Sequence, residues 1–253
     1  MSQTSAPNLA PLALTMGEPA GIAPEITVKA WQTLRSSTEL SFGLIADPAL
    51  FDADLVQVID SIDQAPQVFA HKLPVLPISL AEENRVGHLN PNNGPAVLQS
   101  VQRGVELTMA GQARGLVTNP FHKGALYQSG FNHPGHTEYL AELAGTSEPT
   151  VMMLAASMLR VVPITLHVSV ADAIKQLSPR LIRHACLLTR DYLRANYGIA
   201  EPRLAVSGLN PHAGEGGAMG REEIDIIAPT LDRLRAEGLI IQGPLSADTM
   251  FHG

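Results

Sequence analysis

The sequence predicts an α/β protein with an open sheet, and three features of the chain support this class. Short apolar runs alternate with longer stretches whose apolar residues recur every three or four positions, as in buried strands and amphipathic helices. Turns rich in glycine, proline and polar residues follow several of the short runs. The chain has 253 residues, enough to bury a large core without disulfides or structural metals.

The first half of the chain is expected to alternate strands with helices. Pro24 suits the first turn of a helix that continues through Ile26–Leu34, because that position needs no backbone N–H. The other expected helices span 48–62 and 95–111, the second with apolar residues at three- and four-residue spacing. The expected strands are Leu12–Met16, Phe42–Ala46, Gln67–Ala70, Leu73–Ile78 and Leu116–Thr118.

The second half repeats the alternation with longer loops. Three helices are expected. The first is His136–Ala144, which ends at Gly145, the second begins at Ser178, and the third is Glu222–Ala236. A glycine-rich loop, Asn210–Gly220, separates the last of these helices from the strand before it. The expected strands are Thr150–Ala155, Leu159–His167, Arg203–Gly208 and Leu239–Gly243.

Composition excludes several classes of function. The chain carries 24 acidic and 17 basic residues, a formal net charge of −7, and no clustered Lys or Arg, so no nucleic-acid partner is expected. No apolar run reaches the roughly 18 residues of a membrane span, so no membrane association is expected. The single cysteine, Cys186, forms no internal disulfide, and no signal peptide is recognisable. We therefore expect a cytoplasmic protein.

The domain organisation is expected to be two α/β domains, residues 1–125 and 126–253. The chain stops within what reads as a strand-to-helix junction after Ala247. An open α/β sheet rarely finishes there, so we expect the second domain to be truncated and the chain to be a fragment that is inactive as given.

Five segments that follow predicted strands combine glycine or proline with polar side chains. Ligands of open α/β sheets bind outside the carboxyl ends of the strands, so these segments are candidate sites. The turn Met16–Glu25 offers backbone N–H groups to an anion, or is only a tight turn. Asn119 and Lys123 could hold a carboxylate or a phosphate, although a loop lysine is usually solvated. The remaining three segments contain histidines.

Each of these histidines could either have a structural role in the fold or bind a ligand. Next to His136, Thr137 is expected to cap a helix or to bind an anion at its N-terminus. His167, at a predicted strand end, is a metal-ligand candidate, although taken alone a histidine there is more often a buried structural one. His212 lies in the glycine-rich loop beside Asn210. His167 and His212 could supply two ligands to one divalent cation, with Asp248 the best local candidate for a third.

Four motifs together resemble the 4-hydroxythreonine-4-phosphate dehydrogenase family of vitamin B6 synthesis. The resemblance runs from about residue 10 to the last residue, and the loop around His212 is its most specific part. The motifs are Thr15–Ile22 (TMGEPAGI), Gly135–Glu138 (GHTE), Gly208–Gly217 (GLNPHAGEGG) and Gly243–Thr249 (GPLSADT).

The resemblance implies a fold and a set of roles. Members have an isocitrate-dehydrogenase-like α/β/α fold in two domains, with the active-site cleft between them. They bind NAD or NADP without a Rossmann fingerprint and form homodimers with shared active sites. The implied roles are substrate contact for His136 and Thr137 and binding of a divalent metal (Zn, Mg or Co) for His167 and His212. Asp248, Asn210 and Lys123 are possible supporting residues. A third metal-binding histidine, and a Lys, an Asn and an Arg that hold substrate, lie in the family beyond Gly253 of this chain.

The resemblance implies an oxidative decarboxylation. The family converts 4-phosphooxy-L-threonine and NAD or NADP into 3-amino-2-oxopropyl phosphate, carbon dioxide and the reduced cofactor, for pyridoxal 5′-phosphate synthesis. A related dehydrogenase of 4-phosphoerythronate or 4-phosphothreonate would carry nearly the same motifs. An alternative from another class is a metal-dependent hydrolase with His167, His212 and Asp248 around a zinc-bound water.

Overall fold

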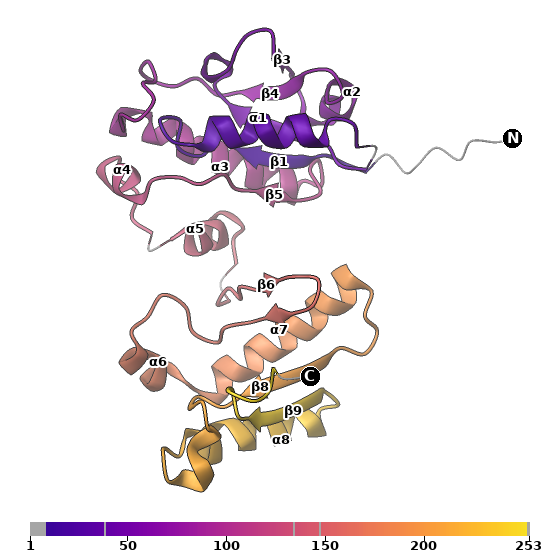
Figure 1. Ribbon diagram of the computed structural model, residues 1–253, viewed down its shortest axis with the longest axis vertical. Coiled ribbons are helices and arrows are strands. Elements are labelled where there is room, and N and C mark those ends of the chain that lie inside the picture. The colour runs from indigo at the N-terminus through magenta and orange to yellow at the C-terminus, as the bar shows by residue number, and fades with distance from the viewer. Residues whose placement is uncertain (1–8, 38, 134, 147, 252–253) are drawn as a thin grey trace, which may run out of the picture. The chain divides into compact units, whose positions relative to one another are not determined.

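The computed structural model describes residues 9–37, 39–133, 135–146 and 148–251. The chain divides into two compact units, Met1–Glu148 and Pro149–Gly253, each with its own hydrophobic cluster. Figure 1 traces both units along the chain. The expected domain boundary at 125/126 falls inside the first of these units.

The first unit is built on a parallel five-stranded sheet. Its strand order is β3-β4-β2-β1-β5, and every neighbouring pair is parallel, which confirms the α/β class. The central strand is β2, which pairs with β1 in the register Leu12 to Phe42 through Thr15 to Ile45. The strands are β1 (Leu12–Thr15), β2 (Phe42–Ala46), β3 (Val56–Val58), β4 (Leu73–Pro77) and β5 (Leu116–Val117).

Helices cover the two faces of this sheet. Figure 1 shows α1 in front of the sheet and α3 behind it. In α1 the buried residues Ala23, Thr27 and Trp31 recur every four positions and so form one buried stripe. The helices of the unit are α1 (Ala23–Leu34), α2 (Ala65–Val68), α3 (Gly94–Met109), α4 (Lys123–Gln128) and α5 (His136–Leu143), with 3₁₀ turns at Pro48–Leu50, Ile62–Gln64 and Pro91–Asn93.

Two expectations for the region between β2 and β4 are wrong. The helix expected over 48–62 is instead two 3₁₀ turns separated by the edge strand β3. Asp47 accepts a hydrogen bond from the amide of Ala49 and closes the chain into a tight turn after one helical turn. The strand expected at Gln67–Ala70 is instead the end of α2 and the turn after it, and Pro66 lies in the first turn of α2, where its missing N–H costs nothing.

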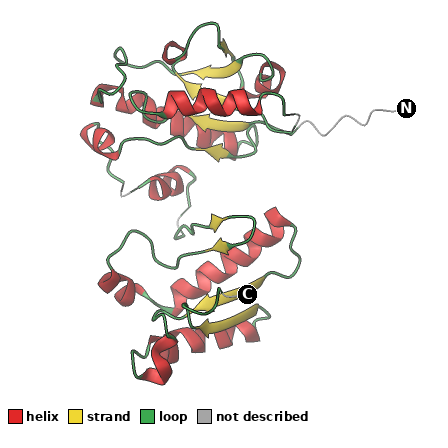
Figure 2. Cartoon of the chain, viewed as in Figure 1, coloured by secondary structure: helices red, strands yellow, loops and turns green. Residues whose placement is uncertain are grey.

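The second unit combines a parallel strand pair with two packed helices. β8 pairs with β9 in parallel, and β6 pairs with β7 in antiparallel (Figure 2). Its core includes Ile182 and Cys186 from α7 and Leu231 and Leu234 from α8. The elements are β6 (Leu154–Ala155), β7 (Arg160–Val161), α6 (Val170–Gln176), α7 (Pro179–Tyr197), β8 (Arg203–Ser207), a π-helical turn (Glu223–Ile227), α8 (Ala228–Ala236) and β9 (Ile240–Leu245).

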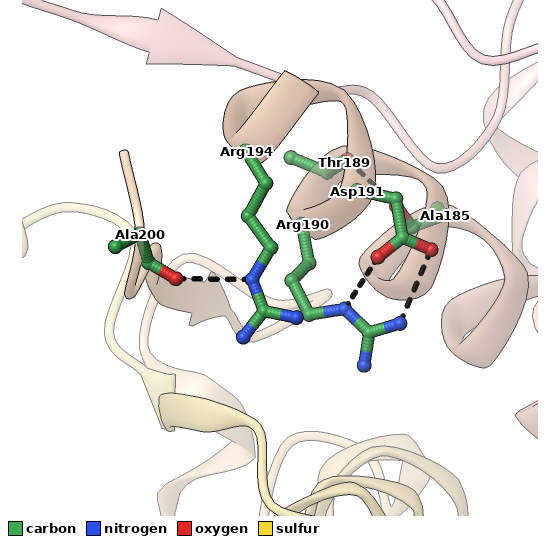
Figure 3. Close-up of polar contacts among 6 residues, drawn as sticks. All are labelled: Ala185, Thr189, Arg190, Asp191, Arg194 and Ala200. Atoms are coloured by element: carbon green, nitrogen blue, oxygen red, sulfur yellow. Dashed lines mark hydrogen bonds and ion pairs between the residues drawn. The ribbon is translucent and has the colours of Figure 1, made fainter. Parts of the chain in front are cut away.

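Local hydrogen bonds define both ends of α7. Ser178 caps its first turn, as the sequence predicts, and Gly198 ends it with a left-handed φ of 65°. Figure 3 shows Arg194 donating from Nε to the carbonyl of Ala200, which ties the chain after the helix back to its last turn. The same view shows Arg190 bound through two nitrogens to the carboxylate of Asp191.

The strands expected before α6 are much shorter than predicted. Only Leu154–Ala155 and Arg160–Val161 pair. Pro163 lacks the N–H that would extend the ladder, so the chain leaves the strand there. His167 therefore ends no strand, and it lies in a bend with a φ of 54° and an exposed side chain. Within the described residues, no helix is both long and apolar enough to cross a membrane.

Candidate functional site

The turn after β1 is a structural junction around Gly17. A Cβ at Gly17, whose φ is +69°, would lie 2.6 Å from Cβ of Asn119 and 2.7 Å from Cβ of Ala23. The backbone N–H of Asn119 donates to Thr15 Oγ1 (3.0 Å). Its side-chain Nδ2 donates to Thr15 O (2.9 Å) and Thr27 Oγ1 (2.7 Å). The side chain is buried in this network, so Asn119 has a structural role at this junction, and ligand binding by Asn119 stays a prediction.

Lys123 and the His136 segment lie together, although a dozen residues separate them in sequence. The charge of Lys123 contributes to lowering the pKa of His136. Lys123 Nζ and Glu138 Oε2 lie 3.7 Å and 3.0 Å from the point that a Cβ of Gly135 would occupy. Gly135 is buried and caps α5, so Thr137 is not the helix cap and sits half-buried in the first turn. The Lys123 ammonium group and the His136 imidazole thus lie close together at the N-terminus of α5.

His136 is held as a neutral imidazole. Its ring packs on Phe121, with a centroid distance of 3.6 Å. Burial and, to a smaller extent, the nearby Lys123 charge together lower the pKa of His136 to about 4. The ring is therefore neutral at pH 7. Its Nε2 and Oε2 of Glu138 are both buried, and neither atom has a hydrogen-bond partner among the described residues. Buried polar atoms normally have a partner, so a bound ligand or water is the expected one.

The glycine-rich loop after β8 contains an unusual left-handed turn. All five residues of Ala213–Gly217 have positive φ, including the non-glycines Ala213 at 51° and Glu215 at 44°. Each non-glycine residue in this conformation costs about 1–2 kcal/mol, so contacts around the loop must hold it. The loop therefore has a defined backbone conformation that its surroundings stabilise.

His212 is oriented by groups on both sides of it. Its Nδ1 lies 3.0 Å from Oδ2 of Asp248, which comes from the chain after β9. Its backbone N–H donates to Oδ1 of Asn210 (3.0 Å), and the amide of Asp248 donates to the carbonyl of Pro211 (3.4 Å). The side chain of His212 remains 56% exposed. The structure thus brings together three of the residues that the sequence nominates.

Glu223 is a residue of this region that the sequence analysis missed. Its side chain is 4% exposed, and its Oε1 accepts a hydrogen bond from the backbone N–H of Asn210 (3.0 Å). A signal was available, because Glu223 falls on the same helical stripe as Ile227, Leu231 and Leu234, all buried. An acidic residue on a buried helical face normally has a specific partner.

A metal ion would find a partial set of ligands here. A ligating histidine usually donates its other ring nitrogen to a carboxylate, and the pair of His212 with Asp248 has this arrangement. His167 offers an exposed imidazole in the same unit. Among the described residues, however, no group of three or more His, Cys, Asp or Glu side chains is placed to hold an ion. The hydrolase interpretation needs such a trio in His167, His212 and Asp248, so it finds no support there.

Fold and site together define a class of protein. A parallel α/β sheet with shaped polar loops beyond its strands, an unpartnered buried imidazole and a carboxylate-bound histidine is an α/β enzyme architecture for a small polar substrate. The comparisons with known proteins narrow this class.

Residues 35–253 match the family described as pyridoxal phosphate biosynthetic protein PdxA, and the chain belongs to this family. A 4-hydroxythreonine-4-phosphate dehydrogenase from Caulobacter vibrioides is 45% identical over 96% of this chain and 75% of its own length. A crystal structure of the enzyme of that name from Klebsiella pneumoniae superposes with a TM-score of 0.85 at 31% identity, covering 96% of this chain and 77% of that one. The corresponding structure from Burkholderia phymatum gives 0.83 at 33% identity, with 96% and 76% covered.

These relatives confirm two expectations from the sequence. The chain has the isocitrate-dehydrogenase-like fold that its solved neighbours share. It is an enzyme of a dehydrogenase family in pyridoxal phosphate biosynthesis.

Proposed function

We propose that this enzyme oxidises and decarboxylates 4-phosphooxy-L-threonine to 3-amino-2-oxopropyl phosphate, with NAD or NADP as the hydride acceptor. The observation that carries the proposal is the 45% identity, over 96% of the chain, to a dehydrogenase named for this substrate. The geometry of the two histidine segments is consistent with it. The product enters pyridoxal 5′-phosphate synthesis.

The N-terminus of α5 is the proposed contact for substrate, through His136 and Thr137. The unpartnered Nε2 of His136 is the supporting observation, because a substrate hydroxyl would satisfy it. Lys123 and the helix N-terminus provide positive potential for the anionic groups of the substrate in a protein whose net charge is −7. A neutral His136 can accept the hydrogen bond of that hydroxyl.

His167 and His212 are the proposed ligands of a divalent cation such as Zn²⁺, Mg²⁺ or Co²⁺. The support is the exposure of both rings and the contact of His212 Nδ1 with Asp248. When bound, such a cation acts as a Lewis acid toward a substrate hydroxyl and the carbonyl formed from it. Asp248 fixes the ring orientation of His212, and Asn210 fixes its backbone. We further propose a homodimer with shared active sites and a cytoplasmic location, both on the family resemblance.

The reaction is tested by following reduced cofactor at 340 nm and carbon dioxide release from the purified protein with 4-phosphooxy-L-threonine, NAD or NADP and a divalent cation. At whatever rate turnover occurs, we expect reduced cofactor and carbon dioxide in equal amounts. Faster turnover of 4-phosphoerythronate or 4-phosphothreonate would contradict the substrate assignment. Phosphate release without cofactor would contradict the reaction class.

The metal assignment has its own test. We expect His212→Ala to lower both Co²⁺ binding, measured by titration calorimetry, and turnover, while its circular dichroism spectrum stays unchanged, because His212 lies on a loop outside the core. The control is His71→Ala, which also removes an exposed imidazole, in the other unit. Unchanged Co²⁺ binding in His212→Ala would contradict the assignment.

A further inference from the structure

The π-helical turn that precedes α8 places one acidic side chain beneath the glycine-rich loop. Glu223 occupies the first position of this turn, and Ile227, Leu231 and Leu234 continue the same buried stripe into the core. Glu223 lies outside this apolar cluster, at the end of the stripe that contacts the glycine-rich loop. The acidic group is therefore buried against loop backbone.

The loop leaves room for this carboxylate at two glycines. A Cβ at Gly208 would lie 2.9 Å from Glu223 Oε1, and a Cβ at Gly214 would lie 2.8 Å from Oε2. Both distances are too short for a real side chain, so the carboxylate occupies the volume that two missing side chains leave. Its Oε2 has no hydrogen-bond partner among the described residues. The remaining oxygen, Oε1, makes the contact that matters for the loop.

A continuous chain of hydrogen bonds leads from Glu223 to His212. Oε1 of Glu223 accepts from the backbone N–H of Asn210 (3.0 Å), and the side chain of Asn210 accepts from the backbone N–H of His212 (3.0 Å). Nδ2 of Asn210 also donates to the carbonyl of Met219 (3.2 Å), which joins the two ends of the loop. Glu223 thus holds Asn210 in place. Asn210 in turn holds the backbone of His212 at one end of the left-handed turn and Met219 at the other.

We propose that Glu223 is a positioning residue for His212, one that holds the loop in its strained conformation without touching the metal or the substrate. The proposal deepens the metal role proposed above for His212 and rests on it for its consequence. The role requires a hydrogen-bond acceptor at Oε1 and not a negative charge. The isosteric amide therefore preserves it, and a shorter apolar side chain does not.

The first experiment measures hydrogen exchange at the amides of Asn210 and His212 in the metal-free 253-residue protein. We expect Glu223→Ala to speed exchange at both amides at least tenfold, and Glu223→Gln to stay within about threefold of the parent chain. Glu237→Gln is the matched control, because it makes the same change at an exposed glutamate just beyond α8. Unchanged protection of Asn210 in Glu223→Ala would overturn the proposal.

The second experiment titrates the same variants with Co²⁺ alone and records affinity and the visible spectrum of the ion. Loss of an outer-shell partner commonly costs 10–100-fold in metal affinity, and we expect a loss in that range for Glu223→Ala with rescue in Glu223→Gln. Equal loss in both variants would overturn the acceptor role. If the parent chain binds no Co²⁺, the proposed metal site fails, and hydrogen exchange still decides whether Glu223 positions the loop.

Discussion

His136 illustrates how the surroundings of one residue set its chemistry. Burial and then Lys123 lower its pKa to about 4, against about 6.5 in an unfolded chain. Between these two values, the unfolded chain binds a proton that the folded chain does not. The free energy of unfolding therefore falls as the pH drops from about 6.5 to about 4, and the loss is complete below that window.

This sign gives a testable result. We expect the parent protein to lose more stability between pH 7.5 and pH 4.5 than His136→Gln, as measured by urea unfolding at both pH values. His71→Gln, which alters an exposed histidine, serves as the control and should follow the parent protein. A titration midpoint near 6.5 for the His136 ring in an NMR experiment would contradict the prediction.

Asp248 gives a second prediction for a single residue. Its Oδ2 is 3.0 Å from Nδ1 of His212, so Asp248→Ala removes the group that orients this ring. We expect Co²⁺ affinity to fall about 10–100-fold, because carboxylate partners of ligating histidines contribute on that scale. Asp232→Ala, at an exposed position in α8, should leave the affinity unchanged. Equal affinities in the two variants would show that His212 needs no carboxylate partner.

Among the elements of the first unit, Asn119 connects three of them. It follows β5 and donates to Thr15 of β1 and Thr27 of α1, with its own side chain buried. Asn119→Ala leaves the Thr15 carbonyl without its donor, so we expect the free energy of unfolding to fall by about 1–3 kcal/mol. Asn132→Ala, at an exposed position, is the control. Identical urea midpoints for the two variants would contradict this structural role.

Elements with a strong local signal could be predicted from the sequence. β2 has the bounds expected for it, and Ser178 begins α7, as expected from capping chemistry that is local in sequence. β3 could not be predicted, because a three-residue edge strand forms only where β4 is present to pair with it. The short helices α4 and α6 lack the length over which periodicity becomes visible.

At the scale of the whole molecule, the sequence nominates site residues but not the atomic contacts between them. It groups Asp248 with His212 around one cation, and the structure places Oδ2 of Asp248 3.0 Å from Nδ1 of His212. Lys123 and His136 were separate candidates that share one electrostatic environment. Such pairings depend on how β8 lies against β9 and how α4 leads into α5, which a pattern of residues along the chain does not encode. For Glu223 the stripe along α8 does give a signal, and only its contact with Asn210 depends on the fold.

The two units also lead to a prediction about independent folding. The single tryptophan, Trp31, belongs to the first unit, where it is 2% exposed and donates from Nε1 to the carbonyl of Phe69 (2.8 Å). Because the first unit has its own apolar cluster around the parallel sheet, we expect a fragment of residues 1–148 to fold alone.

Its folding is read directly from Trp31 fluorescence. The folded fragment should give the emission maximum of the full chain and shift to the red in one cooperative urea transition. Ile45→Asp, which buries a charge at a fully buried position of β2, is the unfolded control and should emit at the red-shifted wavelength without urea. Red-shifted emission from the unmodified fragment would mean that its sheet depends on residues 149–253, and that the two units fold as one.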